Sequence, residues 1–167
     1  MAVLPIKIYP DPILRDPGAV VSDFNLDLRK FLDSMADTMY HAEGIGLAAP
    51  QVGVSRRVAV VDVSQESQER IDLVNPKIIS KSGSVPSEEG CLSIPKYRET
   101  VKRSEKIVVQ AQDGAGKEFE LQAEGLLAIC LQHEIDHLDG VLFIDHLSRL
   151  KRELFKRWLK KQQSEIE

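Results

Sequence analysis

A chain of 167 residues has the length of one domain, and 43% hydrophobic with 29% charged residues is typical of a folded globular protein. This composition excludes a disordered or low-complexity chain, and we find no internal repeat. The net charge of −4 is unevenly distributed. Residues 149–161 hold seven Lys or Arg and one Glu, whereas the rest of the chain holds 15 basic and 25 acidic residues.

Neither the first residues nor the longest apolar run predicts secretion or membrane insertion. Met1–Pro17 carries prolines and charges where a signal peptide needs an apolar run. Leu126–Leu131 is far too short to span a bilayer. In such a chain the two cysteines, Cys91 and Cys130, are more often ligands, nucleophiles or buried residues than disulfide partners. We therefore expect a cytoplasmic protein.

The first predicted element is a helix over residues 26–41. Ser22 or Asp23 is expected to cap it and Gly44 to stop it. Its apolar face is made by Leu28, Phe31, Leu32, Met35 and Met39.

Strands are predicted next. Residues 57–63 are rich in valine and predict a buried strand, and residues 71–80 predict a second one, in which Pro76 marks an edge or an irregularity. Residues 106–112 and 117–123 flank a D-G-A-G sequence, which is typical of a hairpin.

Two further helices complete the prediction, one over about 124–138, ended by Asp139-Gly140, and one from about 148 to the C-terminus. Helices and strands do not alternate regularly, so we expect an α+β fold of mainly antiparallel strands around a central helix. We expect one domain over 1–167, with the basic helix 148–167 as an appendage.

The most specific motif is H-E-x-x-H, formed by His133, Glu134 and His137 in the central helix. Histidines four residues apart lie on one helical face, so both imidazoles can bind one metal ion. The glutamate can then act as a general base beside an open coordination position. A chance pair of surface histidines is the alternative, but the apolar residues before His133 indicate a buried helix, where histidines need partners.

A third ligand is needed for a catalytic site. Cys130 lies about 10.5 Å along the helix axis from His137, too far to share an ion with it, and is more consistent with core packing. His146 matches no ligand spacing and is interpreted as a loop or helix-entry histidine. Cys91 remains, in the sequence E-G-C-L-S, either as a thiolate ligand or as a nucleophile paired with a histidine.

A third segment, Gly44–Gln51, combines small residues with one amide side chain. It predicts close backbone packing or simply a helix stop and turn, and no phosphate site.

Together the three segments resemble the three motifs of the peptide deformylases, in order and spacing and over essentially the whole chain, and most closely those of the bacterial type. The resemblance implies hydrolysis of the formyl group from N-formylmethionine on nascent polypeptides, with release of formate. It implies that Cys91, His133 and His137 hold the ion and that Glu134 is the general base.

The resemblance also implies roles in substrate binding. The side-chain amide of Gln51 and the backbone N–H of Leu92 would stabilise the oxyanion. Gly46 would shape a strand edge, and Ile45 would offer backbone hydrogen bonds to the peptide. The wall of an apolar methionine pocket is expected from Leu92, Ile129 and Cys130.

The family's usual ion is Fe²⁺, with Zn²⁺ or Ni²⁺ as alternatives, although two imidazoles and a thiolate would by general rules favour zinc. Two rivals remain. A small peptidase would take its third ligand downstream, whereas Cys91 lies upstream. A structural metal module would need four protein ligands and leave Glu134 without a role.

The C-terminal helix has two interpretations. Basic residues surround an apolar stripe, so the helix either packs on the domain with a solvated basic face or docks on ribosomal RNA near the exit tunnel, as the resemblance suggests. We expect no DNA partner and no membrane partner, although a membrane-surface helix is compatible in composition. The stripe consists of Leu147, Leu150, Leu154 and Trp158, with Phe155 and Leu159 beside it.

Overall fold

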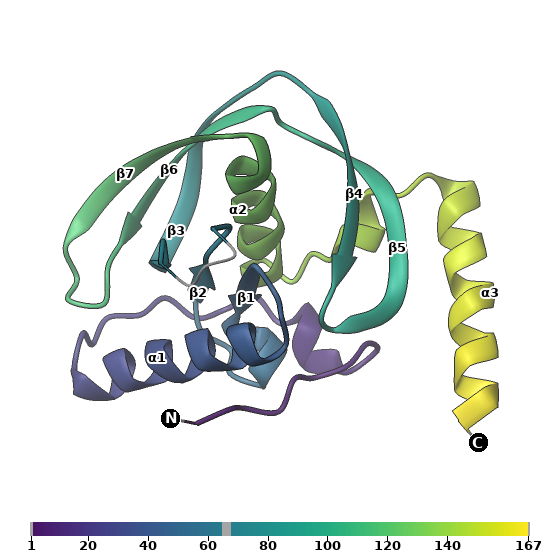
Figure 1. The fold of residues 1–167 in the computed structure, drawn as a ribbon, viewed down its shortest axis with the longest axis horizontal. Helices are drawn as coiled ribbons and strands as arrows, with labels where there is room; N and C mark the ends of the chain where they lie inside the picture. The colour runs from purple at the N-terminus through teal and green to yellow at the C-terminus, as the bar shows by residue number, and fades with distance from the viewer. Residues whose placement is uncertain (1, 65–67, 167) are drawn as a thin grey trace.

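The computed structural model describes residues 2–64 and 68–166. A five-stranded antiparallel sheet, in the order β1-β2-β3-β6-β7, and a two-stranded ribbon, β4-β5, enclose helix α2 (Figure 1). The strands are β1 Gly46–Ala48, β2 Val58–Val61, β3 Ile71–Ser82, β4 Val85–Cys91, β5 Ile94–Arg103, β6 Lys106–Gln112 and β7 Glu118–Glu124. The helices are α1 Leu26–His41, α2 Gly125–Leu138 and α3 Arg149–Ile166, with 3-10 turns η1 Pro12–Arg15, η2 Ala49–Val52 and η3 Phe143–His146. The predicted α+β class is confirmed.

Strand β2 explains how the sheet separates two helices. All four of its residues are fully buried, and successive side chains point to opposite faces. Val58 and Val60 pack in the cluster that contains the apolar face of α1. Ala59 and Val61 pack instead in the cluster that contains α2. A strand buried on both faces therefore positions α2 against the centre of the sheet.

Helix α1 spans the predicted residues, but the residues that cap it differ from those predicted. Its N-cap is Asn25, whose side chain accepts a hydrogen bond from the N–H of Leu28, so the expectation of Ser22 or Asp23 was wrong. The helix ends at His41 with Ala42 as its C-cap, and Glu43, rather than Gly44, takes the left-handed conformation with φ of 58°.

The strand predictions are confirmed with small shifts. The hairpin pairs β6 with β7, and Lys117 falls in the turn rather than in the strand. The irregularity at Pro76 is a register shift of β3 against β6 between Val74 and Lys77. Strand β3 is central rather than an edge, and the neighbouring Asn75 has a φ of 51°.

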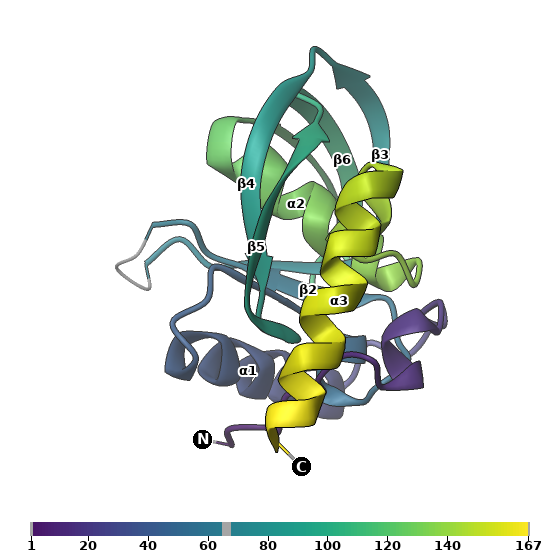
Figure 2. The ribbon, with the colours of Figure 1, turned by 90° about the vertical axis from the view of Figure 1, so that its right-hand side faces the viewer.

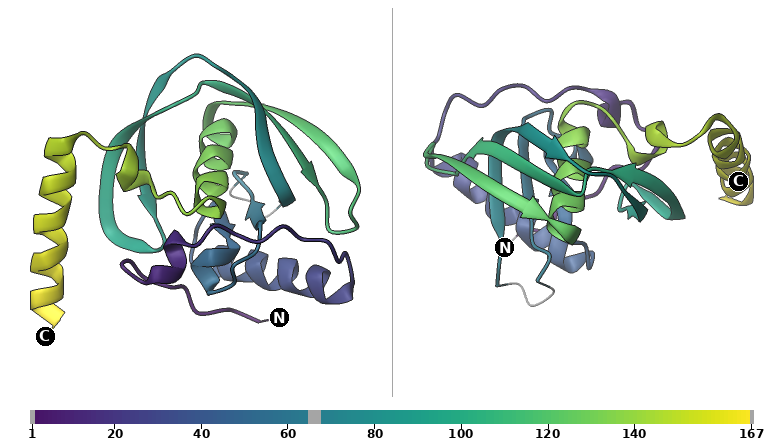
Figure 3. Two further views of the ribbon diagram at one scale, coloured as in Figure 1. Left: turned by 180° about the vertical axis from the view of Figure 1, so that it is seen from behind. Right: turned by 90° about the horizontal axis from the view of Figure 1, so that it is seen from above.

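Helix α3 lies outside the ribbon, on the side away from α2 (Figures 2 and 3). It is attached by Phe155 and Trp158, whose rings lie 4.7 and 4.9 Å from that of Tyr97 on β5. Leu150 and Leu154 are 70% and 50% exposed, so part of the predicted apolar stripe faces solvent. No helix among the described residues has the length and apolarity to cross a membrane.

Candidate active site

Helix α2 brings two imidazoles together as its spacing predicts. His133 and His137 are one turn apart, and their Nε2 atoms lie 3.1 Å from each other. Both side chains are largely buried by the sheet and the ribbon.

Cys91 reaches the same point from the end of β4. A register shift between Glu89 and Cys91 breaks the regular pairing with β5 just before the turn that contains Leu92 and Ser93. The shift places the Cys91 Sγ atom 3.4 Å from His137 Nε2. Cys91, His133 and His137 offer ligand atoms that all lie within 4.8 Å of one another.

The carboxylate of Glu89 fixes the tautomer of His133. Burial alone would raise the pKa of Glu89, but hydrogen bonds from Arg103 and His133 outweigh it and lower the pKa to about 2. The ionised carboxylate can only accept, so His133 Nδ1, 3.0 Å away, donates its proton to Glu89 Oε1. In the neutral imidazole the lone pair of Nε2 is therefore available to a metal ion, as it is in metal-binding histidines.

The arrangement fits one metal ion. Nitrogen and sulfur atoms that share a tetrahedral ion at about 2.0–2.3 Å lie roughly 3.3–3.8 Å apart, close to the observed 3.1 and 3.4 Å. Two imidazoles and a thiol are suitable donors for zinc or iron. Three protein ligands leave one coordination position for water or substrate, as in catalytic sites.

Glu134 lies beside the three candidate ligands, and one of its carboxylate oxygens is not hydrogen-bonded in the described structure. Its Oε1 atom is buried and has no hydrogen-bond partner among residues 2–64 and 68–166. Burial raises the pKa of Glu134 to about 7, against the opposing charges of His133 and Arg103. A carboxyl group whose pKa is near neutrality can both accept and return a proton. Room for it comes from Gly46, where a Cβ atom would lie 2.5 Å from Glu134 Oε2.

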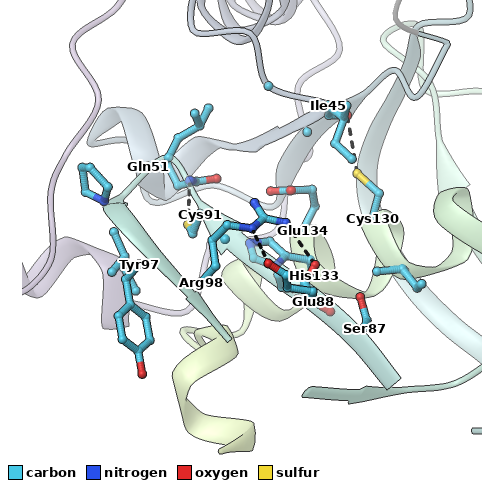
Figure 4. A pocket seen from close by; sticks show the side chains of 18 of the residues that line it. Ile45, Gln51, Ser87, Glu88, Cys91, Tyr97, Arg98, Cys130, His133 and Glu134 are labelled. Carbon is cyan, nitrogen blue, oxygen red and sulfur yellow. Dashed lines mark hydrogen bonds and ion pairs between the residues drawn. The ribbon is translucent and has the colours of Figure 1, made fainter. Parts of the chain in front are cut away.

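Gln51 is oriented by three contacts. Its Oε1 atom accepts a hydrogen bond from the N–H of Ala48 at 3.0 Å, so the amide nitrogen must point the other way. That nitrogen donates to the hydroxyl of Ser93 at 3.2 Å. It also lies 3.5 Å from Cys91 Sγ (Figure 4). The structure therefore aims a donor at the predicted ligand group.

A cleft of about 620 Å³ opens onto these residues (Figure 4). The carbonyl of Ile45 already accepts hydrogen bonds from the N–H of Asp62 and the thiol of Cys130. The cleft brings together every predicted substrate residue, and its lining includes Ile45, Gly46, Leu92, Ile129 and Cys130 along with Gln51, Cys91, His133 and Glu134.

The sequence did not reveal the groups behind the ligands. Glu89 was visible only as the residue before Gly90 in the Cys91 motif. Ser93 was visible only as the last residue of that motif, and Arg103 had no signal, because a lone arginine is an ordinary residue. His146, interpreted as a loop or helix-entry histidine, is the last residue of η3, and its Nε2 atom lies 2.8 Å from Asp136 Oδ2.

Comparisons with known proteins agree with this geometry. Residues 3–153 match the family model described as polypeptide deformylase. The peptide deformylase of Thermodesulfovibrio yellowstonii is 53% identical over 162 residues, covering 96% of this chain and 98% of the relative. A crystal structure of a peptide deformylase from Legionella pneumophila is 49% identical, with a TM-score of 0.92 over 98% of this chain and 96% of that one. The peptide deformylase structure from Thermus thermophilus gives 41% identity and a TM-score of 0.89 over 95% and 94%.

Proposed function

The chain belongs to the peptide deformylase family, metal-dependent enzymes that remove the N-formyl group from nascent polypeptides, and we propose that Cys91, His133 and His137 hold its metal ion. The observation that carries this proposal is the convergence of one Sγ and two Nε2 atoms from two separate elements. We assign the ion as Fe²⁺ on family resemblance, with Zn²⁺ or Ni²⁺ able to replace it. When bound, the ion supplies a Lewis acid that activates water and polarises the formyl carbonyl.

Glu134 is the proposed proton carrier. It accepts a proton as water adds to the formyl carbon of N-formylmethionine and gives a proton to the amine nitrogen when the C–N bond breaks. Formate and a free N-terminus are the products. Its buried Oε1 atom, which has no hydrogen-bond partner in the described part of the chain, supports this role, because a structural site would have no use for a free carboxylate next to the ligands.

The negative charge that develops on the formyl oxygen is stabilised by the Gln51 amide nitrogen and the Leu92 backbone N–H. Gln51 is held in advance by Ala48 and Ser93, and donors that need no reorganisation during the reaction stabilise a transition state most effectively. The methionine side chain occupies the apolar part of the cleft, formed by Leu92, Ile129 and Cys130, while Ile45 and Gly46 border the peptide.

Residues 1–167 then form one cytoplasmic catalytic domain with 148–167 as an appendage that binds the ribosome near the exit tunnel. Arg157, Lys160 and Lys161 are exposed and available to RNA phosphates. Replacing these three by Glu should abolish co-sedimentation with ribosomes at low salt. Unchanged co-sedimentation would contradict ribosome binding by this helix.

The activity is tested by formate release from an N-formyl-Met tripeptide. Protein purified without oxygen and its Glu134→Ala variant are compared at equal metal content. We expect rapid release by the parent and near-complete loss in a variant that retains its metal. A fully metal-loaded parent that releases no formate would contradict the proposal and would favour a peptidase or a structural metal site instead.

A further inference from the structure

Arg103, the last residue of β5, is an arginine with only 4% of its side chain exposed. One edge of its guanidinium pairs with Glu89, Nε with Oε2 and Nη2 with Oε1, each at 2.8 Å. Its remaining nitrogen, Nη1, donates to Asp136 Oδ2 at 2.6 Å. His146 faces the same atoms, with its Nε2 3.4 Å from Arg103 Nη1. One cation thus binds two carboxylates from different elements.

The two carboxylates belong to the two elements that carry the proposed ligands. Glu89 lies on β4 two residues before Cys91, and it accepts the Nδ1 proton of His133. Asp136 lies on α2 next to His137. Arg103 therefore connects the strand that supplies the thiolate with the helix that supplies both imidazoles.

The neighbouring residue strengthens this connection. The backbone N–H of Ser104 donates to the side chain of Gln132, and its carbonyl accepts from the same amide, both at 2.9 Å. Gln132 and Asp136 are four residues apart and lie on one side of the helix turn that bears His133. The end of β5 thus holds α2 at two successive turns.

Stability alone does not explain this network. Removing a guanidinium and two carboxylates from water carries a desolvation penalty that often equals or exceeds their attraction, so a buried ion pair is weak evidence for a gain in stability. The planar guanidinium of an arginine does, however, hold its donors in a fixed geometry, which the ammonium group of a lysine cannot provide. Groups behind metal ligands commonly set ligand orientation and hence metal affinity.

We propose that Arg103 is a positioning residue that sets the spacing between Cys91 and the two histidines, through Glu89 on one arm and Asp136 on the other. The inference rests on the proposed metal site. Arg103 is not among the residues that line the cleft, and it acts only through the residues that it holds.

The test measures Zn²⁺ affinity by competition with a chromophoric chelator, and the visible spectrum of the Co²⁺-loaded protein. Arg103→Lys keeps the charge but cannot bridge both carboxylates, so we expect affinity to fall roughly 10- to 100-fold. The Co²⁺ spectrum should also change, since the ligand geometry is altered. Asp136→Asn, which keeps the Glu89 pair, is expected to lose about tenfold.

Arg57→Lys is the matched control. Arg57 also holds α2, by hydrogen bonds to the carbonyl of Leu138 at 3.0 Å and to Asp139 at 2.9 Å, but it contacts neither Glu89 nor Asp136 in the described structure. It should lower the melting temperature and leave Zn²⁺ affinity within about twofold of the parent.

Each outcome decides the proposal. Weakened affinity and a shifted Co²⁺ spectrum in Arg103→Lys, with an unchanged control, support it. Parental affinity in a folded Arg103→Lys overturns it while leaving the metal site intact. If Arg103→Lys does not fold, parental affinity in Asp136→Asn overturns the second arm and with it the proposed connection. A parent that binds no Zn²⁺ would overturn the metal site itself, and this inference with it.

Discussion

Replacing Gly46 by Ala tests how tightly the active site is packed around its proposed base. Gly46 begins β1, directly against α2, and is itself buried. A Cβ atom there would lie 2.5 Å from Glu134 Oε2 and 2.9 Å from both Glu134 Cδ and Cys130 Sγ. The added methyl group therefore meets the carboxylate itself.

The size of the effect follows from these distances. Non-bonded carbon atoms rest at about 3.5–4.0 Å, so relieving the 2.9 Å contact between the added Cβ and Glu134 Cδ requires a displacement of about 0.6–1.1 Å. Glu134 lies on a packed helix, so its carboxylate must rotate or the strand must move. A misplacement of about 1 Å at a reacting group can reduce the rate about 100-fold. Overpacking also destabilises by about 1–3 kcal/mol.

The assay is steady-state formate release at matched metal content, with thermal unfolding recorded in parallel. Gly46→Ala should lose about 100-fold in kcat while retaining its metal. Gly114→Ala is the control, since its Cβ would meet only Leu32 Cδ1 at 3.1 Å and Arg29 Cγ at 3.5 Å, far from the cleft residues in sequence and outside its lining. A folded, metal-loaded Gly46→Ala with kcat within about threefold of the parent would refute this account of Glu134.

Three other measurements test the surrounding structure. Ser93→Ala removes a hydrogen-bond partner of Gln51 and should lower kcat about tenfold without changing metal affinity; unchanged kcat would show that Gln51 needs no such support. Leu131→Ala, at a fully buried position of α2, should destabilise by about 2–5 kcal/mol in denaturant unfolding, and a loss below about 1 kcal/mol would contradict the packing described. Burial and the hydrogen bond to Asp62 raise the pKa of Tyr40 from 10.0 to about 12, so the unfolded chain releases this proton first, and the free energy of unfolding should decrease as pH rises through that window. Tyr40→Phe should remove this decrease, and an equal slope in the variant would assign it to other groups.

The sequence predicted features that depend on local spacing. The contact between His133 and His137 follows from helix geometry alone, and the β6–β7 hairpin follows from its turn residues. Cys91 was reached only by elimination and by family resemblance, since no local rule connects a strand end to a helix more than 40 residues away.

The remaining features depend on tertiary contacts. Arg103 became visible only when folding brought Glu89 and Asp136 to the same guanidinium. In α3, several apolar residues allow more than one packing face, and contact with Tyr97 selects Phe155 over the more exposed Leu154.

X-ray absorption spectroscopy of the metal-loaded protein, at the edge of the bound ion, tests the central claim most directly. For Zn²⁺ the site described here predicts one sulfur at about 2.3 Å, two imidazole nitrogens at about 2.0–2.1 Å, and one further oxygen that is not from the protein. Cys91→Ala should lose the sulfur signal. A spectrum without sulfur, or with four protein ligands, would contradict a catalytic ion held by Cys91, His133 and His137.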